Sequence, residues 1–99
     1  MTPSKSAIAT IEEWFAAKFP ERSVESGLID NDTVLLRASA FKQPPFELAI
    51  SFEAFEDHEP AAILDDLERG GIAEAFRIDP TPRRLYDRFR RIRSIPRTV

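Results

Sequence analysis

The stretch 46–53 reads Phe-Glu-Leu-Ala-Ile-Ser-Phe-Glu, in which large apolar side chains alternate with polar or small ones. A period of two residues is typical of a β-strand with one buried face. Residues 34–40 alternate in the same way, and the two apolar sets share a face if Ala40 pairs with Phe46 across a five-residue loop. Residues 24–28 join that face through a three-residue turn. This region therefore predicts a three-stranded antiparallel meander.

Apolar residues at helical spacing flank the predicted sheet on both sides. The first set runs from Ile8 to Phe19 and stops before Pro20, because proline disfavours helical geometry in the residue that precedes it. After the strands, a helix is expected over 60–69 and a shorter one over 72–76. We expect the apolar stripes and one sheet face to form a single core that includes Phe15, Leu48, Ile50 and Leu67.

The C-terminal segment favours a last helix over about 82–95. Leu85, Phe89 and Ile92 recur at spacings of four and three, Thr81 can cap the helix and Pro82 suits its first turn. The predicted fold class is α+β: an N-terminal helix, the three-stranded meander and two or three C-terminal helices, in the order α-β-β-β-α-α-α. Because 99 residues suffice for one hydrophobic core, we expect a single two-layer domain over 1–99 with its core at about 5–78.

Charge is distributed unevenly along the chain. Residues 1–81 carry 7 basic and 16 acidic side chains, a formal charge of −9, whereas residues 82–99 carry 7 arginines and one acid, a charge of +6. Arginine can bind phosphate or carboxylate with two parallel hydrogen bonds. On the predicted last helix, Arg84, Arg88 and Arg91 share an outer face. That face can engage phosphates, an acidic partner or the protein's own carboxylates.

The residue content argues against most catalytic chemistry. With no cysteine and one histidine, His58, the chain lacks the ligands of thiolate or multi-histidine metal sites and has no cysteine nucleophile. Its three glycines form no phosphate-binding loop, and Asp65 and Asp66, as neighbours on a helix, point about 100° apart. We therefore expect no enzymatic activity, no metal and no cofactor. No apolar run approaches the roughly 18 residues of a membrane span, so we expect a cytoplasmic protein without membrane contact.

Two further features indicate where a partner can bind. The second face of the predicted sheet is polar except for an apolar spot at Ile29 and Leu35. Phe41 lies in the loop between two predicted strands beside two prolines, where an aromatic ring is a candidate contact. The alternative is that this ring folds back over a neighbour such as Phe46.

The order helix, three strands, helix over residues 5–69 resembles a double-stranded-RNA-binding domain. The resemblance implies phosphate binding by a Lys-rich N-terminus of the second helix, but here that region is acidic, with Glu56, Asp57, Glu59, Asp65 and Asp66. We therefore prefer a small protein-interaction module, of the general character of adaptors, regulators, secretion chaperones or immunity proteins. Its open sheet face or Arg-rich helix would bind a protein partner, and a homodimer remains open. The alternative is nucleic-acid binding by the Arg-rich helix.

Overall fold

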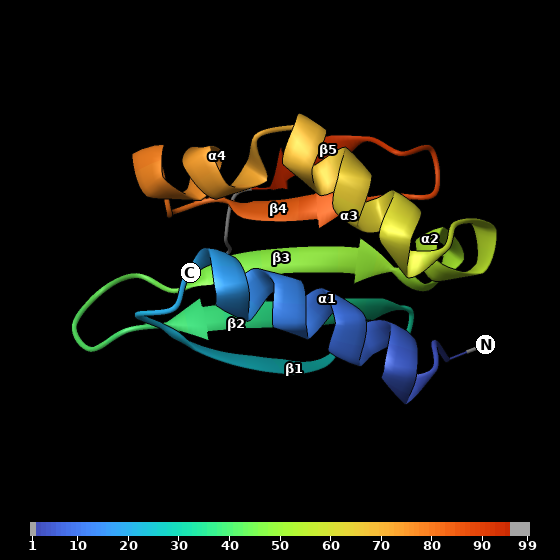
Figure 1. Ribbon diagram of the computed structural model, residues 1–99, viewed down its shortest axis with the longest axis horizontal. Coiled ribbons are helices and arrows are strands. Elements are labelled where there is room, and N and C mark those ends of the chain that lie inside the picture. The colour runs from blue at the N-terminus through green and yellow to red at the C-terminus, as the bar shows by residue number, and fades with distance from the viewer. Residues whose placement is uncertain (1, 96–99) are drawn as a thin grey trace.

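The computed structural model describes residues 2–95 as one α+β arrangement (Figure 1). The elements in chain order are α1 (Lys5–Lys18), β1 (Ser23–Ile29), β2 (Thr33–Ser39), β3 (Phe46–Ser51), α2 (Phe52–Asp57), α3 (Pro60–Arg69), α4 (Ile72–Ile78), β4 (Arg83–Tyr86) and β5 (Ile92–Ile95). The strands form one sheet in the order β1-β2-β3-β4-β5. The β3–β4 pair is parallel, and the other neighbouring strands are antiparallel.

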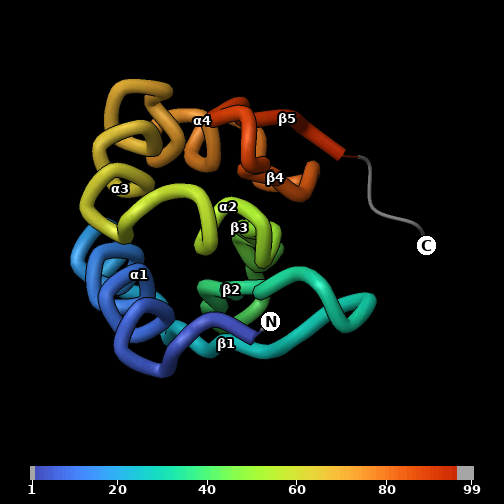
Figure 2. The backbone as a smooth tube through the Cα atoms, turned by 90° about the vertical axis from the view of Figure 1, so that its right-hand side faces the viewer, coloured from blue at the N-terminus to red at the C-terminus, as the bar shows by residue number. Residues whose placement is uncertain are grey.

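The helices and the sheet form two layers. Figure 2 shows α1, α3 and α4 on the same side of the sheet, and α1 contacts both β1 and α3. Helix α1 begins where the Ser4 hydroxyl accepts a hydrogen bond from the Ala7 amide at 3.1 Å, which satisfies an otherwise unpaired helical N–H group. Phe15, Leu48, Ile50 and Leu67 are all fully buried, as expected, in a core that also includes Phe19, Leu36, Ile63, Phe76 and Tyr86.

The strands β1, β2 and β3 pair two residues away from the predicted register. Phe46 pairs with Ala38 rather than Ala40, so the connection between the paired residues is 39–45, two residues longer than the expected 41–45. Arg22 holds this loop by donating to the carbonyl oxygens of Ala38 and Pro44 at 3.1 and 2.9 Å. A shift of two residues leaves each side chain on its own face of the sheet, whereas a shift of one would exchange the faces.

The predicted fold was wrong in its strand number and in its C-terminal helix. The sheet has five strands instead of three, and residues 82–95 form the hairpin β4–β5. Phe89, counted as part of a buried helical stripe, is 72% exposed in the hairpin turn, while Tyr86 is fully buried. The order of elements is accordingly α-β-β-β-α-α-α-β-β.

Residues 82–95 form a hairpin instead of the expected helix because pairing with β3 stabilises the extended form more than the spacing of apolar residues stabilises a helix. Leu48, Ala49 and Ile50 pair with Arg84, Leu85 and Tyr86, so the outer edge of β3 finds its backbone partners there. The turn that makes this arrangement possible has the Asp87 carboxylate accepting from the backbone amides of Phe89 and Arg91 at 2.9 and 3.2 Å. A short acidic side chain that bonds the backbone in this way favours a turn over a helix.

We expect Leu48→Ala to lower the free energy of unfolding by about 2–5 kcal/mol, because the removed atoms leave a cavity in a closely packed core. Leu28→Ala is the matched control: Leu28 also lies in a strand but is 54% exposed, and its truncation should cost far less. Urea titration of the two variants and the parent measures the difference. Equal losses for the two substitutions would contradict the core as described.

Candidate functional site

The β4–β5 hairpin is anchored to the helical layer through Asp66 of α3. The Asp66 carboxylate accepts from the Tyr86 hydroxyl at 2.5 Å and from two nitrogens of Arg90 at 2.7 and 2.8 Å. Arg90 makes this contact from a left-handed backbone conformation, with φ of 62°, in the hairpin turn. The Arg90 guanidinium, helped by the Tyr86 hydroxyl, lowers the pKa of Asp66 from 3.8 to about 2, and burial beside this carboxylate raises the pKa of Tyr86.

A second anchor joins the hairpin turn to α2 and the residue that follows it. Arg88 donates to Asp57 at 2.9 Å and to Glu53 at 2.5 Å, and these two carboxylates raise its pKa. The Arg88 carbonyl oxygen lies 2.7 Å from Nε2 of His58, which must carry the hydrogen because a carbonyl can only accept. His58 and Asp57 are thus both engaged with Arg88 and position the turn.

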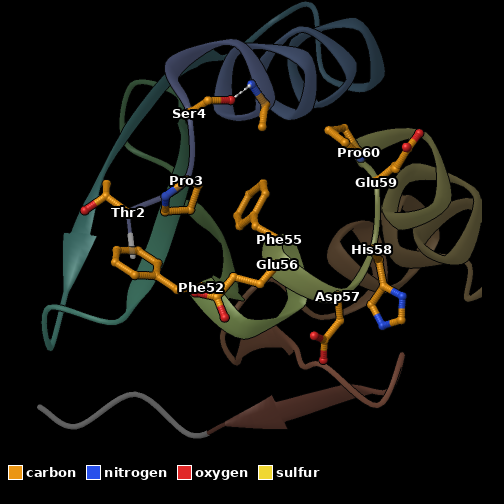
Figure 3. Close-up of a pocket in the computed structure, with 11 residues that line it drawn as sticks. Thr2, Pro3, Ser4, Phe52, Phe55, Glu56, Asp57, His58, Glu59 and Pro60 are labelled. Atoms are coloured by element: carbon orange, nitrogen blue, oxygen red, sulfur yellow. Dashed lines mark hydrogen bonds between the residues drawn. The ribbon is translucent and has the colours of Figure 1, made fainter.

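Next to this anchor lies a hollow of about 430 Å³ between the N-terminal segment and the α2–α3 connection (Figure 3). The Phe55 ring lies between Pro3 and Pro60 on its apolar side, and the acidic residues Glu56, Asp57 and Glu59 line the same hollow. The Asp57 carboxylate is occupied by Arg88. Within residues 2–95 no group of three or more histidine and acidic side chains is arranged to hold a metal ion.

The sheet surface opposite the helices, which we call the open face, has an apolar centre. One row of cross-strand neighbours runs over all five strands: Gly27, Leu35, Ala49, Leu85 and Arg93. Leu35 and Leu85 are half-buried by their neighbours, and no helix or strand among residues 2–95 covers them. Ile29 and Ile95 lie on the same face at opposite edges of the sheet.

Beside this row, Glu47 of β3 is held between two arginines of the neighbouring strands. Its carboxylate accepts from Arg37 at 2.6 and 2.9 Å and from Arg83 at 3.2 Å, and the residue is only 2% exposed. Glu25 of β1 is the cross-strand neighbour of Arg37 in the same row, so the two arginines and two glutamates of this row balance in formal charge. Because a buried carboxylate needs its partners, these contacts also fix where both arginine side chains lie.

The six residues predicted to bind a partner lie in different parts of the structure. Ile29 and Leu35 lie on the open face, as the sequence pattern indicated, and Phe41 is 86% exposed in the β2–β3 loop. The shared outer face of Arg84, Arg88 and Arg91 does not exist, because the helix that would carry it is a hairpin.

Each of these three arginines has a different environment. Arg84 faces the helices, where it donates to the Ala75 and Asp79 carbonyl oxygens. Arg88 is paired with Asp57 and Glu53. Arg91 is exposed at the end of the hairpin turn. The sequence left three partners open for the Arg-rich segment: phosphates, an acidic protein and the protein's own carboxylates. Contacts with the protein's own carboxylates are observed for Arg88, Arg83, Arg90 and Arg93.

The sequence interpretation missed Arg83, Leu85 and Arg93 as residues of the open face. Their signal was the alternation of Arg83 with Leu85, and of Arg93 with Ile95, which is a period of two. The helical spacing of Leu85, Phe89 and Ile92 competes with this pattern in the same short segment. Whether this segment forms a helix or a strand depends on the edge of β3, which needs a backbone partner.

Comparisons with protein-family models, with curated proteins and with solved structures found no match to this chain. In the part of the chain that the structure describes, no helix combines the length and the apolar character needed to cross a membrane.

We expect the stabilising effect of Asp66 to disappear at low pH. Its carboxyl has a lower pKa in the folded protein than in the unfolded chain, so its contribution is present above about pH 4 and is lost as the pH falls towards 2. The difference in free energy of unfolding between the parent and Asp66→Asn should therefore shrink over that range, measured by urea titration at each pH. A difference that stays constant from pH 6 to pH 2 would contradict this role of the ionised carboxylate.

Proposed function

We propose that the protein is a small non-enzymatic interaction module that acts in the cytoplasm. Its open face binds a segment of a partner protein in which apolar residues lie beside acidic ones. The observation that carries this proposal is the apolar centre of the open face, where Leu35 and Leu85 are partly exposed on either side of the buried Ala49 and no helix of residues 2–95 covers them. Burying half-exposed leucines against a partner removes apolar surface from water, which favours association.

The charge of the open face supports an acidic partner segment. Arg91 is exposed at the start of the β5 edge, near Arg93, whereas Arg83 of β4 is already paired with Glu47. Arg91 has no ion-pair contact with any described residue, and Arg93 lies 3.7 Å from Asp87, at the outer limit of an ion pair. The chain up to residue 81 is strongly acidic, so this edge is where an acidic segment would meet attraction instead of repulsion.

Nucleic-acid binding is less well supported by the same arginines. Four arginines of the C-terminal segment are paired with carboxylates of the chain, namely Arg83, Arg88, Arg90 and Arg93. The segment presents its side chains alternately to the helical layer and to the open face, so its charge is divided between two sides of the sheet. Phosphate backbones bind best to a continuous basic surface.

Site-specific photo-cross-linking in cells tests the proposal. A photoreactive amino acid replaces Gly27, where a side chain meets no atom within 4 Å, and in a second variant Ala16, which is exposed on α1 in the opposite layer. We expect protein adducts from position 27 and not from position 16. Sequencing of the attached peptide should find acidic residues next to apolar ones.

Added substitutions test whether the adduct depends on the open face. Leu85→Asp should reduce its yield at least tenfold, because the change puts a charge into the apolar centre and repels an acidic segment. Ile78→Asp is the matched control, since Ile78 is 81% exposed at the end of α4, and it should leave the yield unchanged. Adducts to nucleic acid, adducts only to a second copy of this chain, absence of adducts or equal effects of the two substitutions would each overturn the proposal.

A further inference from the structure

A second hollow lies in the helical layer, on the side of the sheet opposite the open face. It has a volume of about 550 Å³ and lies where the C-terminal end of α3 and the N-terminal part of α4 meet β4 and β5. Its lining combines three arginines with one carboxylate and several apolar side chains: Arg69, Arg84, Arg90, Asp66, Ile72, Ala75 and Ile92. The remaining lining residues are Gly70 and Ser94. In an acidic protein this excess of guanidinium groups in one hollow is unexpected.

Arg84 is the arginine of this hollow whose charge is not balanced. Arg90 forms an ion pair with Asp66, and Arg69 with Asp65 at 2.8 Å. Among residues 2–95 no carboxylate lies within ion-pair distance of Arg84, which instead donates to the carbonyl oxygens of Ala75 and Asp79 and to the Ser94 hydroxyl.

The hydrogen bonds of Arg84 leave donor capacity unused. Three contacts engage its two terminal nitrogens and leave one N–H of Nη1 for a ligand. Nε also has no hydrogen-bond partner, but it is buried and does not itself reach the hollow. A buried N–H without an acceptor is costly, and a guanidinium has five N–H groups to satisfy. The Phe76 ring, whose centroid lies 5.7 Å from the guanidinium carbon, and the backbone carbonyls hold the cation in place without neutralising it.

We propose that this hollow binds the anionic group of a small molecule, a phosphate or a carboxylate, with Arg84 as its principal partner. The Ser94 hydroxyl, which accepts from Arg84, still has its own hydrogen to donate to an oxyanion. Arg69, which is largely exposed, and Arg90 also line the hollow, but each is paired with a carboxylate, so the uncompensated positive charge is that of Arg84. Ile72, Ala75 and Ile92 give the ligand an apolar surface, so the anionic group is expected on a partly apolar body.

Asp66 does not prevent an anion from binding here. Both of its carboxylate oxygens accept hydrogen bonds from Arg90, and one also accepts from Tyr86, so its charge is compensated within the protein. The uncompensated charge in the hollow is therefore positive. This site shares neither Leu35 nor Leu85 with the open face, so its test is independent of the proposed function.

The test uses two substitutions of one exposed residue, Ser94. Ser94→Asp places a carboxylate beside the Arg84 guanidinium and should supply the missing counter-charge from within the protein. Ser94→Asn introduces a side chain of nearly the same shape as that of Ser94→Asp but without the charge. Both retain the arginines and the buried core, so loss of folding does not complicate the comparison.

Binding is measured by titrating the backbone amide resonances of the parent and both variants, in separate series, with inorganic phosphate and with acetate at constant ionic strength. We expect saturable shifts of the Gly70 and Ser94 amides with one or both anions, and the tighter of the two identifies the anionic group. Ser94→Asp should weaken the affinity at least tenfold relative to the parent, and Ser94→Asn, which adds no charge, should weaken it much less. Equal affinities of the two variants, or no saturable shift in the parent with either anion, would overturn the proposal.

Discussion

The parallel pairing of β3 with β4 is the contact on which the rest of the structure depends. A parallel neighbour cannot follow through a tight turn, so the chain must cross from one end of the sheet to the other between the two strands. Helices α2, α3 and α4 make this connection, and α3 and α4 cover the sheet on the way. The pairing also decides that the arginine-rich segment is extended, which sends its side chains to both sides of the sheet.

That alternation gives neighbouring arginines unrelated environments. Arg83 joins Glu47 on the open face, whereas Arg84 contacts the end of α4 on the helical side. In the turn, Arg88 and Arg90 contact acidic residues of α2 and α3. Arg83, Arg88 and Arg90 thus attach the hairpin to acidic residues of the rest of the chain. Among the arginines of 82–95, Arg84 and Arg91 have no ion pair with a described residue.

Local patterns were sufficient for the parts of the fold whose neighbours are close in sequence. Alternation at 46–52 and helical spacing at 8–19 identified core residues correctly, because a register shift of two residues leaves each side chain on its face. The expectation that β3 has only one buried face was wrong, since Glu47 and Ala49 are 2% and 1% exposed. The hairpin could not be found in this way, since its strands are four residues long and are stabilised by β3, far away in the chain. For the same reason Ile29 and Leu35 were placed on the open face, while Leu85, which lies in the same cross-strand row as Leu35, was not.

The long crossover has a consequence for synthesis of the chain. When β3 has left the ribosome, residues 52–82 must still be made before β4 can pair with its outer edge. At about 5–20 residues per second, the edge of β3 that faces β4 lacks its partner for roughly 2–6 seconds, while β2 is already available to pair with the other edge. An apolar strand edge is prone to pair with other chains, and a charge within the strand opposes such pairing. Glu47 lies within this strand and is already paired with Arg37 of β2, and Arg83 joins the pair only when β4 has been made.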